Sequence, residues 1–420
     1  MMKRRTFLLG AGTAAIGTAA VLRESDQGGP YSPYFMNLNH SLQHSGLARP
    51  AIIIDLDKVD ANIDQVRSFI RTPKTYRIVV KSLPSLPLLQ YIMKRADTNA
   101  LMAFHQPFLN TIASECPTAD VLMGKPLPVA AAASFYRELK PGQFDSQKQL
   151  QWLIDTPERL SHYQALAQSL GVKMRIALEL DIGLHRGGFT DSISVAAALD
   201  SIAADPTHLE FSGFMGYEAH IAKLPGMQRV LRNTVNNYRE FYDAAKASHP
   251  ALFSGRLTLN TAGSQTYQLY QDDTFFNDLC AGSGLVMPTD FDIPTLSSHQ
   301  PAAFIAAPVL KKYNSVQLAG LEWASGLFAL SNPNRQQAFY IYGGNWQAEY
   351  ESPPGLKRNA IWGHSSNQEM VNASNRVSLK VDDYVFMRPR QSEFVFLQFG
   401  DLVTVRGGDV SESWPVFQQS

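Results

Sequence analysis

Residues 76–82 read Tyr-Arg-Ile-Val-Val-Lys-Ser, a short run of mostly β-forming residues that closes on a single amine, Lys81. The run predicts a buried strand, and Lys81 would lie where that strand passes into a loop. Barrels of parallel strands carry their catalytic groups at this edge. A primary amine there can form a Schiff base with an aldehyde, whereas a solvated lysine that merely ends a strand is the simpler interpretation.

Strand-like and helical runs alternate along the chain around this segment. A buried strand at 51–54 comes first. Helical periodicity then predicts helices at 55–70, 86–95, 157–170, 193–204 and 227–248. Eight further strands are predicted at 77–81, 100–104, 120–123, 150–154, 173–181, 209–215, 256–260 and 275–280. Eight strands with intervening helices favour an α/β fold of the (β/α)8 TIM-type barrel over an open sheet.

The pattern changes near Pro288. Short β-type runs separated by Gly, Pro and Asn follow at 304–310, 337–341, 377–380 and 402–405, with almost no helical period. They predict a smaller, mostly antiparallel β domain over residues 290–420. The barrel domain is expected at 48–289, and the Gly/Pro/Tyr-containing stretch at 26–47 is expected to be a linker.

Composition excludes several classes of protein. The 420 residues are 45% hydrophobic and 18% charged, which is typical of an ordinary globular protein. Lys+Arg and Asp+Glu balance at 37 each, so no global field indicates a nucleic-acid partner or an anionic membrane. Two cysteines, Cys116 and Cys280, cannot build a disulfide framework, and neither has the CxxC spacing of a zinc site.

The N-terminus has the pattern of a targeting segment. Lys3-Arg4-Arg5 precedes Phe7, Leu8 and a short run rich in Gly and Ala. We expect a signal peptide over residues 1–25, similar to the twin-arginine signals that export folded proteins. This predicts the export machinery as a partner, a periplasmic location and cleavage after Ala20. A retained membrane anchor and an amphipathic arm are the alternatives.

Three later segments place polar groups after predicted strands. Residues 176–189 contain Glu179, Asp181 and Arg186, which would also suit a structural salt-bridge cluster. Residues 214–220 end in Tyr-Glu-Ala-His, with groups able to transfer protons, although a lone histidine is more often a satisfied core residue. Residues 258–266 read TLNTAGSQT, whose backbone N–H groups could bind phosphate or merely form a turn.

In order, the segments VVKS, ELDIGLHRGGF, GYEAH and NTAGSQT resemble the fold-type III pyridoxal-phosphate enzymes. The D-threonine aldolase and D-serine dehydratase group, relatives of alanine racemase, is the most similar, and AIIIDLDKVDANI resembles its opening strand and helix. The resemblance runs from about residue 48 to the C-terminus. It implies that Lys81 forms the Schiff base with pyridoxal phosphate and that Arg186 faces the pyridine nitrogen. The residues implied to contact the phosphate are Tyr217, Ala262, Gly263 and Ser264, with His220 lining the pocket.

The chain departs from the group's pattern at two places. Ile78, Val79 and Ser82 stand where the lysine segment usually has Pro, His and Thr. The group's C-terminal metal pair, His-x-Cys or His-x-Asp, would fall after 400–405, but the histidine is replaced by glycine and only Asp409 could remain. One carboxylate does not hold a divalent metal, so the sequence argues against one and predicts no metal ligands.

Two polar runs in the β domain, 362–369 and 388–393, are either solvent-facing loops or a cover for the barrel mouth that binds substrate. His364 in the first run is a candidate base. The leading hypothesis is a pyridoxal-phosphate-dependent lyase, of aldolase or dehydratase type, that acts on a D-amino acid through Lys81. An amino-acid racemase, with His220 or His364 serving the second face, and a non-catalytic cofactor-binding protein are the alternatives. Relatives of this type often complete the site across a dimer, which makes a homodimer an expectation.

Overall fold

The computed structural model describes residues 24–142, 144–316 and 332–420. Their contacts divide the chain into two units. The barrel unit comprises Leu56–Ala302, Gln391–Leu402 and Ser413–Ser420, and the β unit comprises the residues up to Asp55, Ala303–Arg390 and Val403–Glu412. The signal predicted at 1–25 falls on residues 1–23, outside the described part. None of the helices in the described ranges is long and apolar enough to cross a membrane.

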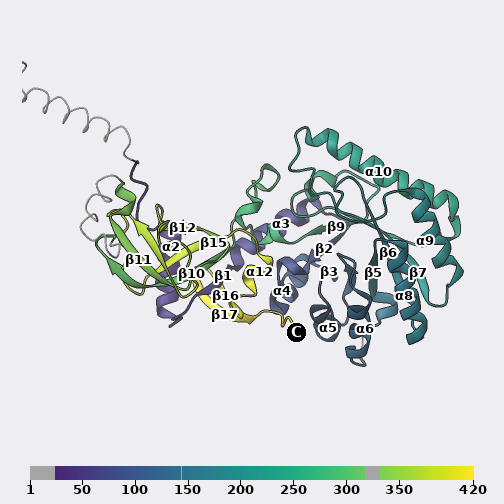
Figure 1. Cartoon of the computed structure of the whole chain (residues 1–420), viewed down its shortest axis with the longest axis horizontal. Coiled ribbons are helices and arrows are strands. Elements are labelled where there is room, and N and C mark those ends of the chain that lie inside the picture. Colours follow the sequence, from purple (N-terminus) through teal and green to yellow (C-terminus); the bar gives the residue numbers. More distant parts are fainter. Residues whose placement is uncertain (1–23, 143, 317–331) are drawn as a thin grey trace, which may run out of the picture. The chain divides into compact units, whose positions relative to one another are not determined.

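The barrel unit contains a closed barrel of eight parallel strands, which confirms the predicted fold (Figure 1). Its strands are β2 (Thr75–Val79), β3 (Ala100–Ala103), β4 (Asp120–Met123), β5 (Leu150–Ile154), β6 (Met174–Leu180), β7 (Leu209–Gly216), β8 (Thr258–Thr261) and β9 (Asp278–Ala281). All eight coincide with predicted strands to within a few residues. They are recognisable in the sequence because the strands of a barrel surrounded by helices are buried on both faces and therefore form short apolar runs.

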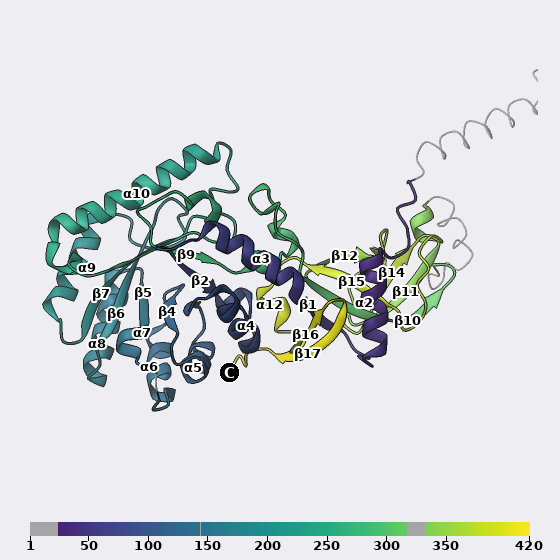
Figure 2. The same ribbon diagram turned by 180° about the vertical axis from the view of Figure 1, so that it is seen from behind.

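Helices surround these strands in both views (Figures 1 and 2). They are α3 (Leu56–Phe69), α4 (Leu86–Ala96), α5 (Gln106–Glu115), α6 (Val129–Glu138), α7 (Ser146–Gln149), α8 (Pro157–Leu170), α9 (Ser192–Ala204) and α10 (Met227–Ser248). Helix α8 illustrates the local rules. Thr156 accepts the N–H of Arg159 as N-cap, Pro157 opens the helix, and Gly171 ends it in a left-handed conformation.

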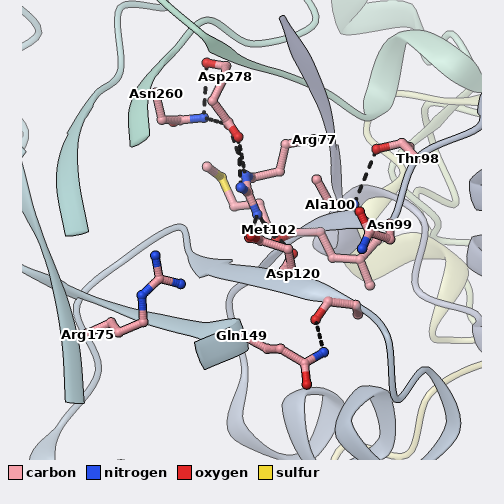
Figure 3. Close-up of polar contacts among 12 residues, drawn as sticks. Arg77, Thr98, Asn99, Ala100, Met102, Asp120, Gln149, Arg175, Asn260 and Asp278 are labelled. Atoms are coloured by element: carbon pink, nitrogen blue, oxygen red, sulfur yellow. Dashed lines mark hydrogen bonds and ion pairs between the residues drawn. The ribbon is translucent and has the colours of Figure 1, made fainter. Parts of the chain in front are cut away.

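An ion-pair network around a buried arginine lies between strands of the barrel, and no sequence pattern predicted it (Figure 3). Arg77 on β2 is 2% exposed and donates from Nε and Nη2 to Asp278 at 2.9 and 2.7 Å. Its Nη1 donates to Asp120 and to the carbonyl of Leu101 at 2.9 and 3.0 Å. Because Asp120 and Asp278 are the first residues of β4 and β9, the guanidinium holds strands together near their N-terminal ends, opposite the edge that carries Lys81.

The β unit contains a mostly antiparallel sheet, as predicted. Its strands among the described residues are β1 (Ala51–Asp55), β10 (Ala303–Tyr313), β11 (Gln337–Tyr342), β12 (Ala348–Ser352), β13 (Lys357–Arg358), β14 (Gln368–Ala373), β15 (Tyr384–Pro389), β16 (Asp401–Arg406) and β17 (Asp409–Pro415). Helix α2 (Pro33–His44) packs Phe35, Leu38 and Leu42 against this sheet, in a cluster with Ile53 and Phe386.

Several predicted elements and domain boundaries differ from the structure. Residues 51–55 pair with β10 in the β unit rather than opening the barrel domain, because an apolar strand specifies burial without specifying its partner. Much of the predicted linker is helix α2, whose apolar residues recur at helical spacing after a Ser32 N-cap. The run 377–380 forms no strand, although Val377 and Leu379 are buried. Residues 290–302, 391–402 and 413–420, which were predicted for the β domain, belong to the barrel unit.

Candidate active site

A cavity of about 530 Å³, counting the space open to solvent, lies at the carboxyl ends of the barrel strands. Its walls come from residues at or just after the ends of β2, β3, β4, β6, β7, β8 and β9, which is where parallel barrels carry their chemistry. Six of the residues predicted from the sequence line it: Lys81, Arg186, Tyr217, Ala262, Gly263 and Ser264. Residues dispersed over 184 positions are therefore brought to one cavity.

Lys81 lies just beyond its strand rather than within it. Strand β2 ends at Val79, and residues 80–82 form one 3-10 turn that presents the lysine to the cavity. The side chain is 46% exposed. Its Nζ lies 5.1 Å from the centroid of the Phe104 ring and 3.5 Å from Oε1 of Glu393. The Phe104 ring occupies the space beside Gly124, where a methyl group would collide with it.

Arg186 stacks on an aromatic ring instead of joining a salt-bridge cluster. Its Cζ lies 4.8 Å from the centroid of the Tyr217 ring, a cation–π contact. Asp181 pairs with His185, whose Nδ1 is 2.9 Å from the carboxylate. Burial raises the pKa of the neighbouring Glu179 to about 7, with Asp155 adding to the shift and Arg186 opposing it. Arg186 is thus held over Tyr217 with its guanidinium at the cavity wall.

A buried carboxyl supports the loop that follows β8. Glu218 is fully buried and accepts hydrogen bonds from Ala262 N at 3.1 Å, Thr261 Oγ1 at 3.2 Å and Thr266 Oγ1 at 2.6 Å. Burial raises its pKa to about 7, and these hydrogen bonds partly oppose the shift. Ala262 has a φ of 73°, a left-handed conformation that turns the chain sharply at the strand end. Glu218 therefore fixes the shape of the 261–266 loop through hydrogen bonds to both of its ends.

The hydrogen-bond donors around this loop fit a phosphate group. No residue in the described ranges accepts the backbone N–H of Ser264 or Ser283, although both residues are buried and line the cavity. The Tyr217 hydroxyl likewise has no acceptor among them. A Cβ on Gly263 would lie 2.8 Å from Tyr217 Cε2, so only glycine lets the loop approach this ring. Unused donors beside a tight turn are the usual setting of an anion site.

Not all of the residues predicted to contact the phosphate have a free hydrogen-bond donor. The N–H of Ala262 is used by Glu218, and that of Gly263 by Thr266 Oγ1 at 3.1 Å. Ser264 Oγ accepts from Gly282 N at 2.9 Å and Gly284 N at 3.0 Å, which ties the end of β8 to the end of β9. Its O–H remains available as a donor. Ala262 and Gly263 thus shape the site, whereas Ser264 can donate to a ligand.

The two predicted histidines lie elsewhere. His220 Nε2 is 3.2 Å from Thr234 Oγ1 on α10, and its ring lines a separate groove beside Gly183. Burial lowers its pKa. His364 belongs to the β unit, where its Nδ1 is 3.1 Å from the Glu369 carboxylate and its ring contacts Arg358. The catalytic roles of both residues stay predictions.

Sequence reasoning missed several residues of the cavity. Glu393 begins the short helix α12 (Glu393–Phe396), which belongs to the barrel unit. Glu393 lies in the polar run 388–393, a predicted cover of the barrel mouth, but its pairing with Lys81 was not predicted. Phe104 and Ser283 were not singled out because nothing in their local sequence distinguishes them from ordinary strand-end residues. Across the described ranges, no group of three or more His, Cys, Asp and Glu side chains could hold a metal ion.

Comparison with known proteins agrees with this architecture. Residues 54–289 match the model of the alanine racemase N-terminal domain, which covers more than half of the chain. The chain belongs to the alanine racemase N-terminal domain family. Members of this family use pyridoxal phosphate. The unused hydrogen-bond donors of the cavity and the amine of Lys81 fit the phosphate and the aldehyde of this cofactor.

Individual relatives are distant. A 3-hydroxy-D-aspartate aldolase from Paracoccus denitrificans (strain Pd 1222) is 26% identical over 143 residues, which span 33% of this chain and 35% of that relative. The match thus spans about a third of the length of the curated relative. Many solved structures are similar in fold, and three of them represent the range. D-threonine aldolase from Filomicrobium marinum has a TM-score of 0.69 at 15% identity, covering 89% of this chain and 98% of its own.

The other two solved structures are a dehydratase and a racemase. D-threo-3-hydroxyaspartate dehydratase from Delftia sp. HT23 has a TM-score of 0.65 at 13% identity, with coverage of 87% and 97%. Alanine racemase from Bacillus anthracis has a TM-score of 0.66 at 13% identity, with coverage of 88% and 98%. At these identities the likeness establishes only the fold. The reaction that this chain catalyses must be argued from its site.

Proposed function

We propose that this chain is a pyridoxal-phosphate-dependent lyase that acts on a D-amino acid, of aldolase or dehydratase type. The observation that carries the proposal is the common cavity of Lys81, Arg186 and the unused donors of Tyr217, Ser264 and Ser283. An amine, a guanidinium and a set of phosphate donors in one barrel mouth fit one cofactor molecule. The partial likeness to a hydroxy-D-aspartate aldolase supports a lyase acting on a D-amino acid.

Each of these cavity residues would have a separate role in binding the cofactor. Lys81 is the amine that would hold the cofactor's aldehyde carbon, Arg186 would face the pyridine nitrogen, and the Tyr217 and Ser264 hydroxyls would bind the phosphate. When bound, pyridoxal phosphate accepts the electron pair released at the substrate Cα. A guanidinium keeps its proton, so Arg186 orients the ring and donates a hydrogen bond without taking part in proton transfer.

Proton transfer must come from other groups of the cavity. Lys81 Nζ, once free of the cofactor, can exchange a proton with the reacting groups of the substrate. Burial and the neighbouring Glu218 raise the pKa of Tyr217 to about 12, so its hydroxyl stays protonated and acts as a hydrogen-bond donor. Met102 and Met215 supply apolar parts of the cavity wall and carry no group that transfers a proton.

The cofactor assignment is tested by absorbance. The full chain reconstituted with pyridoxal phosphate should absorb visible light, and Lys81→Ala should abolish that band. Lys94→Ala, on the exposed face of α4, is the matched control and should keep it. A wild-type protein that stays colourless after addition of the cofactor would refute the proposal.

The reaction type is tested with a substrate panel. The loaded enzyme is incubated with D-threonine, D-serine, 3-hydroxy-D-aspartate and D-alanine, and aldehyde, keto acid and optical inversion are measured. We expect aldehyde or keto acid from a hydroxylated D-amino acid. Inversion of alanine without cleavage would instead identify a racemase, and no turnover of any substrate by the coloured protein would favour a cofactor-binding protein without activity.

We also propose export through the twin-arginine route, with a periplasmic location for the mature protein. The pattern Arg4-Arg5 before Phe7 and Leu8 supports it. Replacing both arginines by lysine should leave the full-length precursor in the cytoplasm, as seen by fractionation and blotting. Equal export of wild type and variant would refute this route.

A further inference from the structure

Glu393 is the acidic group that the predicted site did not include. Helix α12, which it begins, buries Val395 and Phe396, and Gln391 Nε2 donates to Asp290 Oδ2 at 3.2 Å. These contacts lie within the barrel unit. The carboxylate is therefore held at the cavity by the same unit that carries Lys81.

The carboxylate is aimed at Lys81 by a chain of hydroxyls. Glu393 Oε1 lies 3.5 Å from Lys81 Nζ and accepts the Ser82 hydroxyl at 3.3 Å. Ser283 Oγ donates in turn to Ser82 Oγ at 2.9 Å. Among the described residues that line the cavity, Glu393 has the only carboxylate, and its side chain is 27% exposed. A half-buried ion pair with an oriented acceptor is more than a surface contact between flexible side chains.

The ammonium of Lys81 has two stabilising neighbours, an aromatic ring and a carboxylate. The ring of Phe104 lies 5.1 Å from Nζ, and the Glu393 carboxylate lies 3.5 Å from it. Because the cavity offers both a negative charge and an aromatic face, the cationic form of a free Lys81 has a defined position in it.

We propose that Glu393 is a positioning residue, which holds Lys81 as an ion pair whenever the lysine nitrogen is free of the cofactor. The inference rests on the proposed function, in which a substrate amine takes the place of Lys81. Over the whole exchange the protons that the substrate ammonium loses are matched by the protons that Nζ takes up, so that Nζ is released as an ammonium. The total charge on the two nitrogens is unchanged, and Glu393 stabilises the new ammonium without itself being consumed.

The ion pair with Glu393 would determine where the protonated Nζ of a released Lys81 lies. A released lysine without a partner would be free to swing into solvent, because its side chain is 46% exposed. Paired with Glu393, it stays at the end of β2 with a proton on Nζ, ready to return it. Loss of the carboxylate should therefore slow exchange between Lys81 and a substrate amine more than it weakens binding of the cofactor.

The first test uses the cofactor-free full chain and needs no activity. Brief labelling with acetic anhydride near pH 8, followed by mass spectrometry of the peptides, measures the reactivity of Lys81 relative to Lys94. Glu393→Gln should raise the labelling of Lys81 about two- to fivefold, the range that corresponds to a partly exposed ion pair. Glu158→Gln, an exposed acid on α8, is the control and should leave the ratio unchanged. An unchanged Lys81 ratio in Glu393→Gln would overturn the inference.

The second test uses the loaded enzyme. Glu393→Gln should show the visible band of the wild type, whereas the spectral change on mixing with D-alanine in a stopped-flow instrument should be slower. Glu393→Asp should recover part of the rate, since it restores the charge at a longer distance. Equal exchange rates in wild type and Glu393→Gln would overturn the inference. A wild type without any visible band would overturn the proposed function instead, and the labelling result would still report on the ion pair.

Discussion

Replacing Glu218 by glutamine should change how the stability of the protein depends on pH. The carboxyl is fully buried at the loop after β8, and its hydrogen-bond partners among the described residues are hydroxyl and amide donors. Burial in such a place disfavours the charged form. Glutamine has nearly the same shape and stays neutral at every pH, so Glu218→Gln removes the titration while keeping the side-chain volume.

The size of the effect follows from the raised pKa. The pKa of Glu218 rises from an ordinary 4.5 to about 7 in the folded protein. Between these two pH values the folded state holds a proton that the unfolded state has lost, so the stability falls as the pH rises. The contribution of Glu218 to the free energy of unfolding is fully present below pH 4.5 and fully lost above about pH 7. A shift of this size corresponds to about 3 kcal/mol of unfolding free energy.

The assay is urea unfolding of wild type and Glu218→Gln at a series of pH values from acid to mildly alkaline, followed by tryptophan fluorescence. From the acid to the alkaline end of the series, the free energy of unfolding of the variant should rise by about 3 kcal/mol relative to that of the wild type. Glu179, whose pKa is raised in the same direction, titrates in both proteins and drops out of the difference. Glu158→Gln should run parallel to the wild type. Parallel curves for Glu218→Gln as well would refute the reasoning.

Three further outcomes follow from particular contacts. Asp278→Ala should cost about 3–5 kcal/mol in urea unfolding, because the Arg77 guanidinium is left buried without its main partner; a loss typical of a surface substitution would contradict this. Gly263→Ala should weaken retention of pyridoxal phosphate about tenfold by displacing the Tyr217 ring, measured by equilibrium dialysis, and unchanged retention would contradict the phosphate role of that hydroxyl. Cys280 should resist thiol reagents in the folded protein and react in urea, since burial and the Asp278 carboxylate raise its pKa; stoichiometric labelling without urea would be the contrary result.

The candidate site could be predicted from sequence to the extent that it follows strand ends. Lys81, Arg186, Tyr217 and the 262–264 loop each come at or shortly after the end of a predicted strand, and parallel strands bring such ends to one edge. His220 follows a strand end as well, yet its ring turns toward α10. The position of a residue after a strand indicates the edge, but the direction of its side chain depends on the local turn.

Partners distant in the sequence could not be predicted in this way. Glu393 reaches Lys81 from 312 positions further along the chain, and Asp278 reaches Arg77 across 201. Short-range patterns do not encode which charges meet, because many acids and bases are chemically able to pair. The same holds for β1, whose apolar residues specify a buried strand but not that β10 is its neighbour.

The local pattern of the sequence was enough to predict a barrel of eight strands, a separate β domain and Lys81 at the carboxyl end of a barrel strand, because burial imposes a local period on strands and helices. Only the tertiary structure decided which groups surround the lysine, which N–H donors remain for a phosphate, and that Glu393 is its ion-pair partner. Those features depend on distances between remote segments, and such distances arise only when the strands close into a barrel.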